Sequence, residues 1–278
     1  LKRSKQNRKS GSSGPSTVLV LLLILMVSGV TVASAAVITA GGAAAVTLTQ
    51  LEEGLPDPRS FQDLDFNEQS LMYSRDGVKL AEFWNDRRDV IDRFEEIPKV
   101  VLDATTATED DTFWTNPGVD LEATVGQLFT VAGGGDARGA STITQQLVRA
   151  VLLPDAVLES QFESDEALYT RKAKEIIQAY RLTQAFPGED GKQDIITAYL
   201  NQIPYGGPIH GIRAAADVYL GKDLEELTLA ETAYLAAIPQ TPSVFYPYAK
   251  NKKGGYANLT RIKSGKGKNK KVKYVLRQ

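Results

Sequence analysis

The sequence predicts a mainly α-helical domain with a small N-terminal β-hairpin, carried on a single transmembrane helix. Three observations support this fold class. Apolar residues recur at helical spacing in several segments between residues 100 and 238. Residues 70–83 alternate around an Asp-Gly pair, which is typical of a hairpin. Residues 17–40 form one apolar run that is long enough to cross a bilayer.

The N-terminal part divides by charge and hydropathy. Residues 1–16 contain five basic residues and no acid, and residues 10–51 contain no charged residue. This favours a basic cytoplasmic tail (1–16), a transmembrane helix (17–40) and an extracytoplasmic remainder. A cleaved signal peptide is the alternative, because residues 32–36 are small. Residues 41–63 are a linker rich in small residues and proline.

The remaining charge is distributed unevenly. All 34 acidic residues lie between Glu52 and Tyr248, together with 16 of the 32 basic residues. A domain this acidic is a poor nucleic-acid binder, so no nucleic-acid partner is expected. The chain has no cysteine and one histidine, His210, which excludes thiolate chemistry and a two-histidine metal site. His210 lies in a loop with glycine and proline and is expected to be solvated.

Local patterns place the first elements of the domain. Ser70 to Phe83 is expected to form a hairpin with its turn at Asp76-Gly77. A helical segment is expected to begin after Pro98.

A glycine-rich loop precedes a helix near the middle of the chain. Glycines at 133–135 and 139 are followed by Ser141, Thr142 and Thr144, each able to cap a helix. Apolar residues at 143, 147, 148, 151 and 152 then recur at helical spacing. A helix start has free backbone N–H groups and partial positive charge, which suits a phosphate. Further polar donors on this helix are Gln145, Gln146 and Arg149. On the pattern alone, an ordinary loop and a core helix are the simpler interpretation.

The residues of this segment resemble a known family. Residues 139–147, GASTITQQL, are similar to the G-G-S-T-I-T-Q-Q-L signature of the peptidoglycan glycosyltransferases of family 51. These are the polymerase domains of class A penicillin-binding proteins and of monofunctional transglycosylases. The resemblance implies a lysozyme-like glycosyltransferase domain over residues 64–248.

A second motif supplies a carboxylate pair. Glu109 and Asp110 lie close in sequence to Phe113 and Trp114, and burial beside these rings and other acids would raise the pKa of Glu109. A carboxylate with a raised pKa can act as a general base, although solvated acids at a helix end would be the simpler interpretation. The segment is similar to the family's E-D-x-x-F-x-x-H-x-G-x-D motif. Asn116 replaces the histidine and cannot titrate, so a proton relay through this position is left open.

A third motif, residues 171–175, is similar to the family's R-K-x-x-E. Arg171 and Lys172 lie four and three residues before Glu175, so the three side chains share a helix face. By itself this would be a solvated, salt-bridged helix start. The resemblance implies that Glu175 is the second catalytic carboxylate and that Lys172 binds the pyrophosphate region.

Later segments continue the resemblance. Residues 195–206 are similar to I-L-E-x-Y-L-N-x-I-x-x-G, with Thr197 in place of the acid. Thr228 and Glu231 form a capping box before a helix that is expected to run to Ile238. Residues 249–278 carry eleven basic residues and no acid, and they are expected to be the start of a truncated linker region. No S-x-x-K transpeptidase motif occurs in the sequence.

The resemblance implies an enzyme of cell-wall synthesis that polymerises lipid II with inversion and releases undecaprenyl pyrophosphate. Glu109 would be the general base, and Glu175 would act with nearby cations on the pyrophosphate. Expected partners are lipid II, the growing glycan strand, the plasma membrane and a cell-wall synthesis complex. A divalent cation, Mg²⁺ or Mn²⁺, could bridge an acid and the pyrophosphate, and its ligands are not assigned. The implied substrate-binding residues are Asp110, Ser141, Thr142, Thr144, Gln145, Gln146, Arg149, Arg171, Lys172 and Asn201.

Two other function classes remain open. A lysozyme-like hydrolase also uses carboxylates on a helical fold. The R-K-x-x-E and S-T-I-T-Q-Q segments argue against it. A non-catalytic membrane scaffold is supported only by the departures at Asn116 and Thr197, since both key glutamates are present.

Overall fold

The structure is a computed structural model that describes residues 50–66, 70–83, 86–124, 126, 141–248, 259–264 and 271–276. The predicted cytoplasmic tail, transmembrane helix and glycine loop lie outside these residues. Within the described part of the chain, no helix is both long and apolar enough to cross a membrane.

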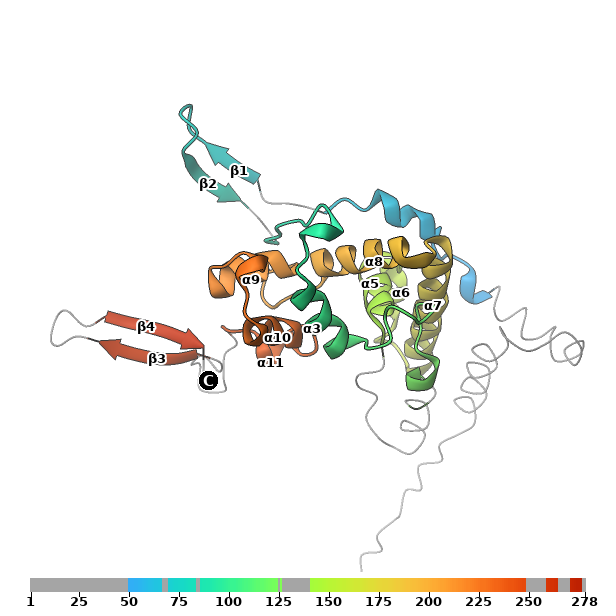
Figure 1. Ribbon diagram of the computed structural model, residues 1–278. Coiled ribbons are helices and arrows are strands. Elements are labelled where there is room, and N and C mark those ends of the chain that lie inside the picture. Colours follow the sequence, from blue (N-terminus) through green and yellow to red (C-terminus); the bar gives the residue numbers. More distant parts are fainter. Residues whose placement is uncertain are drawn as a thin grey trace, which may run out of the picture.

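The described chain is mainly helical, as predicted (Figure 1). Helix α5 packs against both α7 and α8, and α3 packs against α10. The described part of the chain also contains three short 3-10 helices, η1 to η3. The helices are α3 (Lys99–Glu109), α5 (Ile143–Val151), α6 (Asp155–Ser160), α7 (Asp165–Ala185), α8 (Gly188–Gln202), α9 (Ile212–Leu220), α10 (Leu229–Ala237) and α11 (Pro242–Phe245). The 3-10 helices are η1 (Pro58–Asp63), η2 (Phe94–Glu96) and η3 (Leu224–Glu226).

Local sequence explains where these helices begin and end. The predicted capping box at the start of α10 is present: Thr228 Oγ1 accepts from the Glu231 N–H, and Glu231 accepts from the Thr228 N–H. Helix α8 follows Pro187, and its first turn contains two acids that suit the positive end of the helix dipole. Helix α9 ends at Gly221, whose φ of 66° lies in the left-handed region.

Part of the core lies between α5, α7 and α8. Leu147, Leu182, Ile195, Ile196 and Leu200 have no exposed surface. Burying a side chain of this size stabilises the fold by about 1.5–3 kcal/mol relative to leaving it exposed. These residues therefore fix the mutual positions of the three helices that carry most of the predicted site.

Gly118 brings the loop after α3 close to α7. Its φ is +91°, and a Cβ built there would lie 2.5 Å from the Ala179 carbonyl oxygen and 2.5 Å from Thr183 Oγ1. Its carbonyl oxygen accepts a hydrogen bond of 2.7 Å from Thr142 Oγ1. Only glycine allows the loop to approach α7 this closely and still contact the start of α5.

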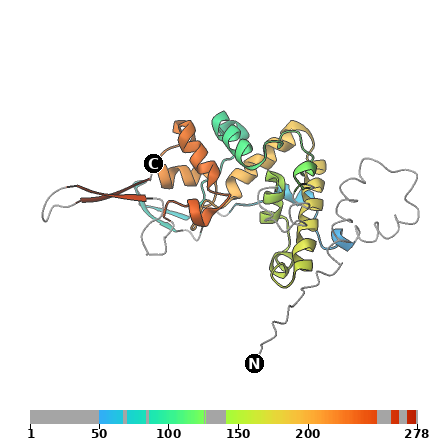
Figure 2. The ribbon, with the colours of Figure 1, turned by 90° about the horizontal axis from the view of Figure 1, so that it is seen from below.

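Two antiparallel hairpins accompany the helices. The predicted hairpin is confirmed as β1 (Ser70–Tyr73) and β2 (Lys79–Phe83), with Gly77 at a φ of 78° in the turn. The second hairpin, β3 (Leu259–Ser264) and β4 (Lys271–Leu276), was not predicted, because the basic tail was expected to be a linker. It extends away from the helices in both views (Figures 1 and 2).

Candidate active site

The end of α3 is attached directly to the start of α5. Asp110, which follows α3, accepts a 3.1 Å hydrogen bond from the Ile143 N–H through Oδ2. Thr142 Oγ1 accepts from the Gln145 N–H at 3.1 Å, and Gln145 Oε1 accepts from the Thr142 N–H at 2.9 Å. These contacts form a capping box with an additional carboxylate cap. The expectation of free backbone donors for a phosphate at this helix start is therefore wrong for three of the N–H groups.

Glu109 is the last residue of α3 and is half-buried. Its Oε2 accepts a 2.8 Å hydrogen bond from Gln146 Nε2. Its Oε1 is buried and has no hydrogen-bond partner among the described residues. Burial raises the pKa of Glu109, and the hydrogen bond from Gln146 opposes this shift. The direction of the pKa shift and burial as its main cause agree with the sequence prediction.

Two buried tyrosines lie near the Glu109 carboxylate. Tyr199 and Tyr205 are at most 1% exposed; burial raises the pKa of each phenol, and the Glu109 carboxylate adds to the shift. The Tyr199 hydroxyl donates to Gln146 Oε1 at 3.3 Å. Gln146 therefore connects a buried phenol to the predicted general base.

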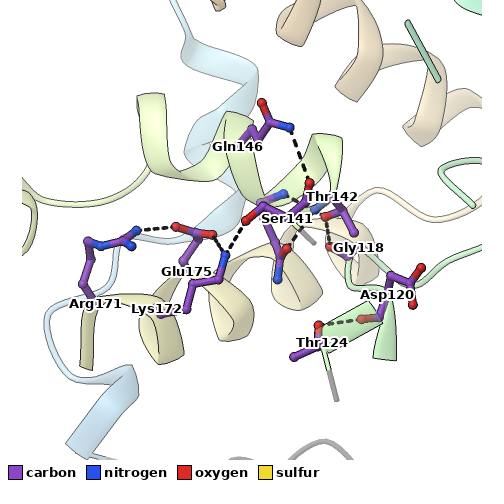
Figure 3. A network of polar contacts seen from close by, with 10 residues as sticks. Gly118, Asp120, Thr124, Ser141, Thr142, Gln146, Arg171, Lys172 and Glu175 are labelled. Atoms are coloured by element: carbon purple, nitrogen blue, oxygen red, sulfur yellow. Dashed lines mark hydrogen bonds and ion pairs between the residues drawn. The ribbon is translucent and has the colours of Figure 1, made fainter. Parts of the chain in front are cut away.

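A second cluster lies on α7. Glu175 is fully buried and forms ion pairs with both Arg171 and Lys172. Lys172 Nζ also donates a 2.7 Å hydrogen bond to Ser141 Oγ, at the start of α5 (Figure 3). Burial lowers the pKa of Lys172, while Glu175 opposes the shift. Arg149 is exposed at the other end of α5, and its charge reaches both Lys172 and Tyr199. The structure thus places Lys172 next to Ser141, with Arg171 bound to the same carboxylate, Glu175.

A cleft of about 190 Å³ opens beside Glu109. Its lining includes Asp111, Asp120 and Ser141 as well as the two residues of the carboxylate pair. A larger hollow of about 1000 Å³ lies against α8 and is lined by Phe61, Ile91, Asn201 and others. Neither predicted catalytic glutamate lines it. We place the candidate site at the smaller cleft because the buried carboxylate and the cation cluster are next to it.

Several predicted binding residues have structural partners instead. Thr142 and Gln145 form the capping box, and Thr144 is fully buried. Asn201 is 2% exposed: its Nδ2 donates to the Ile91 carbonyl oxygen, and its Oδ1 accepts from the Ile91 N–H. Both ends of the amide are therefore used to attach the segment before η2 to α8. Substrate contacts by these four residues stay predictions, and we leave them out of the proposed mechanism.

The sequence prediction missed the network around Asn116. Asn116 Nδ2 donates to both oxygens of Asp110, and its Oδ1 accepts from the Gly118 N–H at 2.9 Å and from Lys192 Nζ at 3.2 Å. Lys192 Nζ also lies 4.6 Å from the centroid of the Phe113 ring. The Asn116 amide therefore links the Asp110 carboxylate to the buried Lys192 ammonium group through hydrogen bonds. The signal for Lys192 in the sequence was weak, since a lysine in the first turns of a helix is normally solvated.

Thr197 lies away from the candidate site, and His210 is less exposed than the sequence predicted. Thr197 donates to the Gln193 carbonyl oxygen at 2.8 Å and lines the larger hollow. His210 was expected to be solvated, but its side chain is only 21% exposed, and burial lowers its pKa. Its backbone pairs with Arg87 and Pro204, which explains the loss of exposure.

The described residues do not provide a protein-bound metal site. No group of three or more acidic or histidine side chains among them is arranged to hold an ion. Both oxygens of Asp110 already accept hydrogen bonds from the protein. The predicted divalent cation stays a prediction.

Comparison with known proteins decides the family. The transglycosylase family model matches residues 76–264 of the chain. The chain belongs to the transglycosylase family. This agrees with the resemblance to family 51 drawn from the motifs.

Individual transglycosylase relatives support the same assignment. Penicillin-binding protein 1A of Vibrio cholerae serotype O1 is 36% identical over 198 residues, which are 71% of this chain and 22% of that protein. Penicillin-binding protein 1A of Escherichia coli strain K12 is 36% identical over 201 residues, 71% of this chain and 22% of that protein. The protein of the same name from Clostridium tetani is 32% identical over 220 residues, 77% of this chain and 26% of that protein. The chain spans about a quarter or less of the length of these relatives.

Proposed function

We propose that this transglycosylase chain is a peptidoglycan glycosyltransferase that polymerises lipid II into glycan strands in cell-wall synthesis. The observation that carries the proposal is the half-buried Glu109, whose Oε1 has no protein partner among the described residues, in a cleft that is also lined by Ser141, the hydrogen-bond partner of Lys172. A base needs a lone pair that no protein group occupies and a raised pKa, and a pyrophosphate leaving group needs positive charge.

The proposed reaction is a displacement with inversion at the anomeric carbon of the lipid-linked donor. Glu109 takes the proton of the acceptor's sugar hydroxyl as its oxygen bonds to that carbon. The bond from the carbon to the pyrophosphate oxygen breaks, and undecaprenyl pyrophosphate leaves with the electron pair. Lys172, Arg149 and Ser141 would face the developing charge, since Lys172 already donates to Ser141.

Glu175 has a different part in this proposal. It is fully buried between Arg171 and Lys172, so it is a counter-ion that positions both cations rather than a base. Without it, two buried cations would repel each other. Gln146 would hold Glu109 through Oε2 and leave Oε1 for the acceptor hydroxyl.

The test compares the two glutamates with labelled lipid II. Glu109→Gln should abolish polymerisation while a lipid II analogue still binds, because the amide keeps the shape and loses the base. Glu175→Gln should impair binding of pyrophosphate-bearing ligands as well as activity, because Lys172 loses its counter-ion.

Each outcome of this assay separates the function classes. Glycan polymer from the wild type supports the proposal, whereas cut strands would indicate a hydrolase and no product a scaffold. An active Glu109→Gln variant would contradict the base assignment. Arg59→Gln is a matched control, because this exposed residue lies in η1 and pairs only weakly, at 4.0 Å, with Asp57.

A further inference from the structure

A buried phenol reaches the candidate base through a single side chain. The Tyr199 hydroxyl, on α8, donates to Gln146 Oε1 at 3.3 Å, and Gln146 Nε2, on α5, donates to Glu109 Oε2 at 2.8 Å. Gln146 Nε2 also lies 3.4 Å from the Ser141 carbonyl oxygen. Three helices thus meet at one amide group, and the amide lies between a donor and a carboxylate.

We propose that Tyr199 is a positioning residue for Glu109, acting through Gln146. The proposal rests on the proposed function, in which Glu109 is the base. A donor opposite Gln146 Oε1 fixes the amide with its N–H groups toward Glu109. The reversed amide would set its carbonyl oxygen against the carboxylate and leave the phenol proton without its acceptor.

The environment of Tyr199 keeps it a donor. Its side chain has no exposed surface, and burial with the charges of Glu109 and Asp110 raises the pKa of the phenol well above its ordinary value. In the described part of the chain, Gln146 is the only acceptor of its proton. The hydroxyl therefore remains protonated at any pH at which the enzyme works.

As a consequence, the two carboxylate oxygens of Glu109 have different roles. Oε2 is held by Gln146, whereas Oε1 has no protein partner among the described residues and is left for a substrate proton. The Gln146 hydrogen bond also lowers the pKa of Glu109 against the effect of burial. Loosening Gln146 should therefore raise that pKa and favour the protonated, inactive carboxyl.

Other titratable groups lie in the same cleft as Glu109 or act on its neighbours. Asp110, Asp111 and Asp120 line the same cleft, and Arg149 lies close enough to influence Tyr199. Lys192 acts on Asp110 from α8, and Tyr205 lies near Glu109. None of these groups is altered by removing the Tyr199 hydroxyl, so a shift caused by that removal reports the Gln146 contact.

The experiment measures lipid II polymerisation against pH for the full chain and its Tyr199→Phe variant. The phenylalanine keeps the ring and removes only the hydroxyl. The acid limb of the profile should move upward by roughly half to one pH unit, the size of one ordinary hydrogen bond. Tyr234→Phe is the matched control, because its hydroxyl donates to the Phe245 carbonyl oxygen on α11 and not to Gln146. An unchanged acid limb in Tyr199→Phe would overturn the proposal.

A double-mutant cycle tests the route through the amide. Gln146→Met should raise the acid limb at least as far as Tyr199→Phe, and the double variant should match Gln146→Met alone. Full additivity would mean that Tyr199 acts on Glu109 without Gln146, which contradicts the proposal.

A second measurement is independent of the reaction. Carboxyl-labelled glutamate allows Glu109 to be titrated by NMR, with its signal identified by its loss in Glu109→Gln. Tyr199→Phe should raise the Glu109 midpoint by the same half to one pH unit. If the wild type does not polymerise lipid II, the proposed function fails, and this titration still decides the role of Tyr199.

Discussion

Lys192 is a lysine ammonium group with very little contact with water. The residue is 5% exposed, and its Nζ has the Asn116 amide oxygen on one side and the Phe113 ring on another. Burial lowers its pKa to about 8, although the Asp110 charge opposes this. Its desolvation is offset only in part by these neighbours, which is typical of a buried lysine.

The lowered pKa of Lys192 determines how the stability of the fold changes with pH. Between pH 8 and lysine's usual pKa of about 10.4, the unfolded chain binds a proton that the folded chain has released. Stability therefore rises with pH across this window. Relative to Lys192→Met, the wild type should gain roughly 2–3 kcal/mol of unfolding free energy from pH 8 to 10.4.

Urea unfolding of both proteins at several pH values in this window measures the difference. Lys99→Met is the control, since the Lys99 side chain is 84% exposed and pairs with Asp103 on the surface. Parallel stability curves for wild type and Lys192→Met would show that Lys192 keeps its ordinary pKa.

At the scale of elements, the site depends on how the loop after α3 lies on α7. Gly118 makes that contact possible, because a Cβ would meet the Ala179 carbonyl oxygen and Thr183 Oγ1 at 2.5 Å. The same loop carries Asn116, and the Gly118 carbonyl accepts from Thr142 at the start of α5. A displaced loop would therefore disturb the attachment of α3 to α5.

Gly118→Ala should lower stability by about 2–4 kcal/mol, since it combines backbone strain with overpacking. Activity should fall more than the loss of folded protein explains, because Asp110 and Glu109 would move. Thermal unfolding and turnover of the soluble fraction measure the two effects. Gly54→Ala provides a control with a similar φ of 77° and no atom within 4 Å of the added Cβ. Equal losses in the two variants would show that packing against α7 is unimportant.

At the scale of the whole molecule, the charge pattern predicts the orientation in a membrane. Five basic residues precede the apolar run at 17–40, and no acid occurs before Glu52. We propose a single-pass protein with a cytoplasmic N-terminus and an extracytoplasmic catalytic domain, which would place the site where cell-wall precursors are polymerised.

A pair of reporters fused after Gln278 tests this orientation. The first reporter is an enzyme that folds only outside the cytoplasm, and it should be active. The second is active only inside the cytoplasm, and it should show no activity. Changing the five N-terminal basic residues to glutamine should weaken the preference, because these charges orient the helix. Cytoplasmic activity of the wild-type fusion would contradict both the orientation and the lipid II assignment.

Local signals in the sequence were sufficient for much of this fold. The Asp76-Gly77 hairpin and the Thr228–Glu231 capping box are confirmed, because each depends on residues close together in the chain. The contact between Lys172 and Ser141 joins residues that are 31 positions apart in the sequence. Residue spacing does not predict such a contact, whereas the family motifs placed both residues in one site.

The internal contacts of the site could not be predicted. Asn116 was recognised as a departure from the motif, but its link to Lys192 joins residues 76 positions apart. Asn201 was assigned to a substrate, whereas its amide is used by the backbone of Ile91. A polar residue in a motif can serve either a ligand or the fold, and sequence spacing does not distinguish the two when the partner is backbone.

The pairing of two cations with one carboxylate on α7 also affects how the protein should be handled. Arg171 and Lys172 share Glu175, so this cluster of three side chains carries one net positive charge. Phosphate, sulfate and pyrophosphate in a buffer would collect there as counter-ions and compete with substrate. In the proposed reaction the pyrophosphate product would be retained by the same charge, so we expect product inhibition.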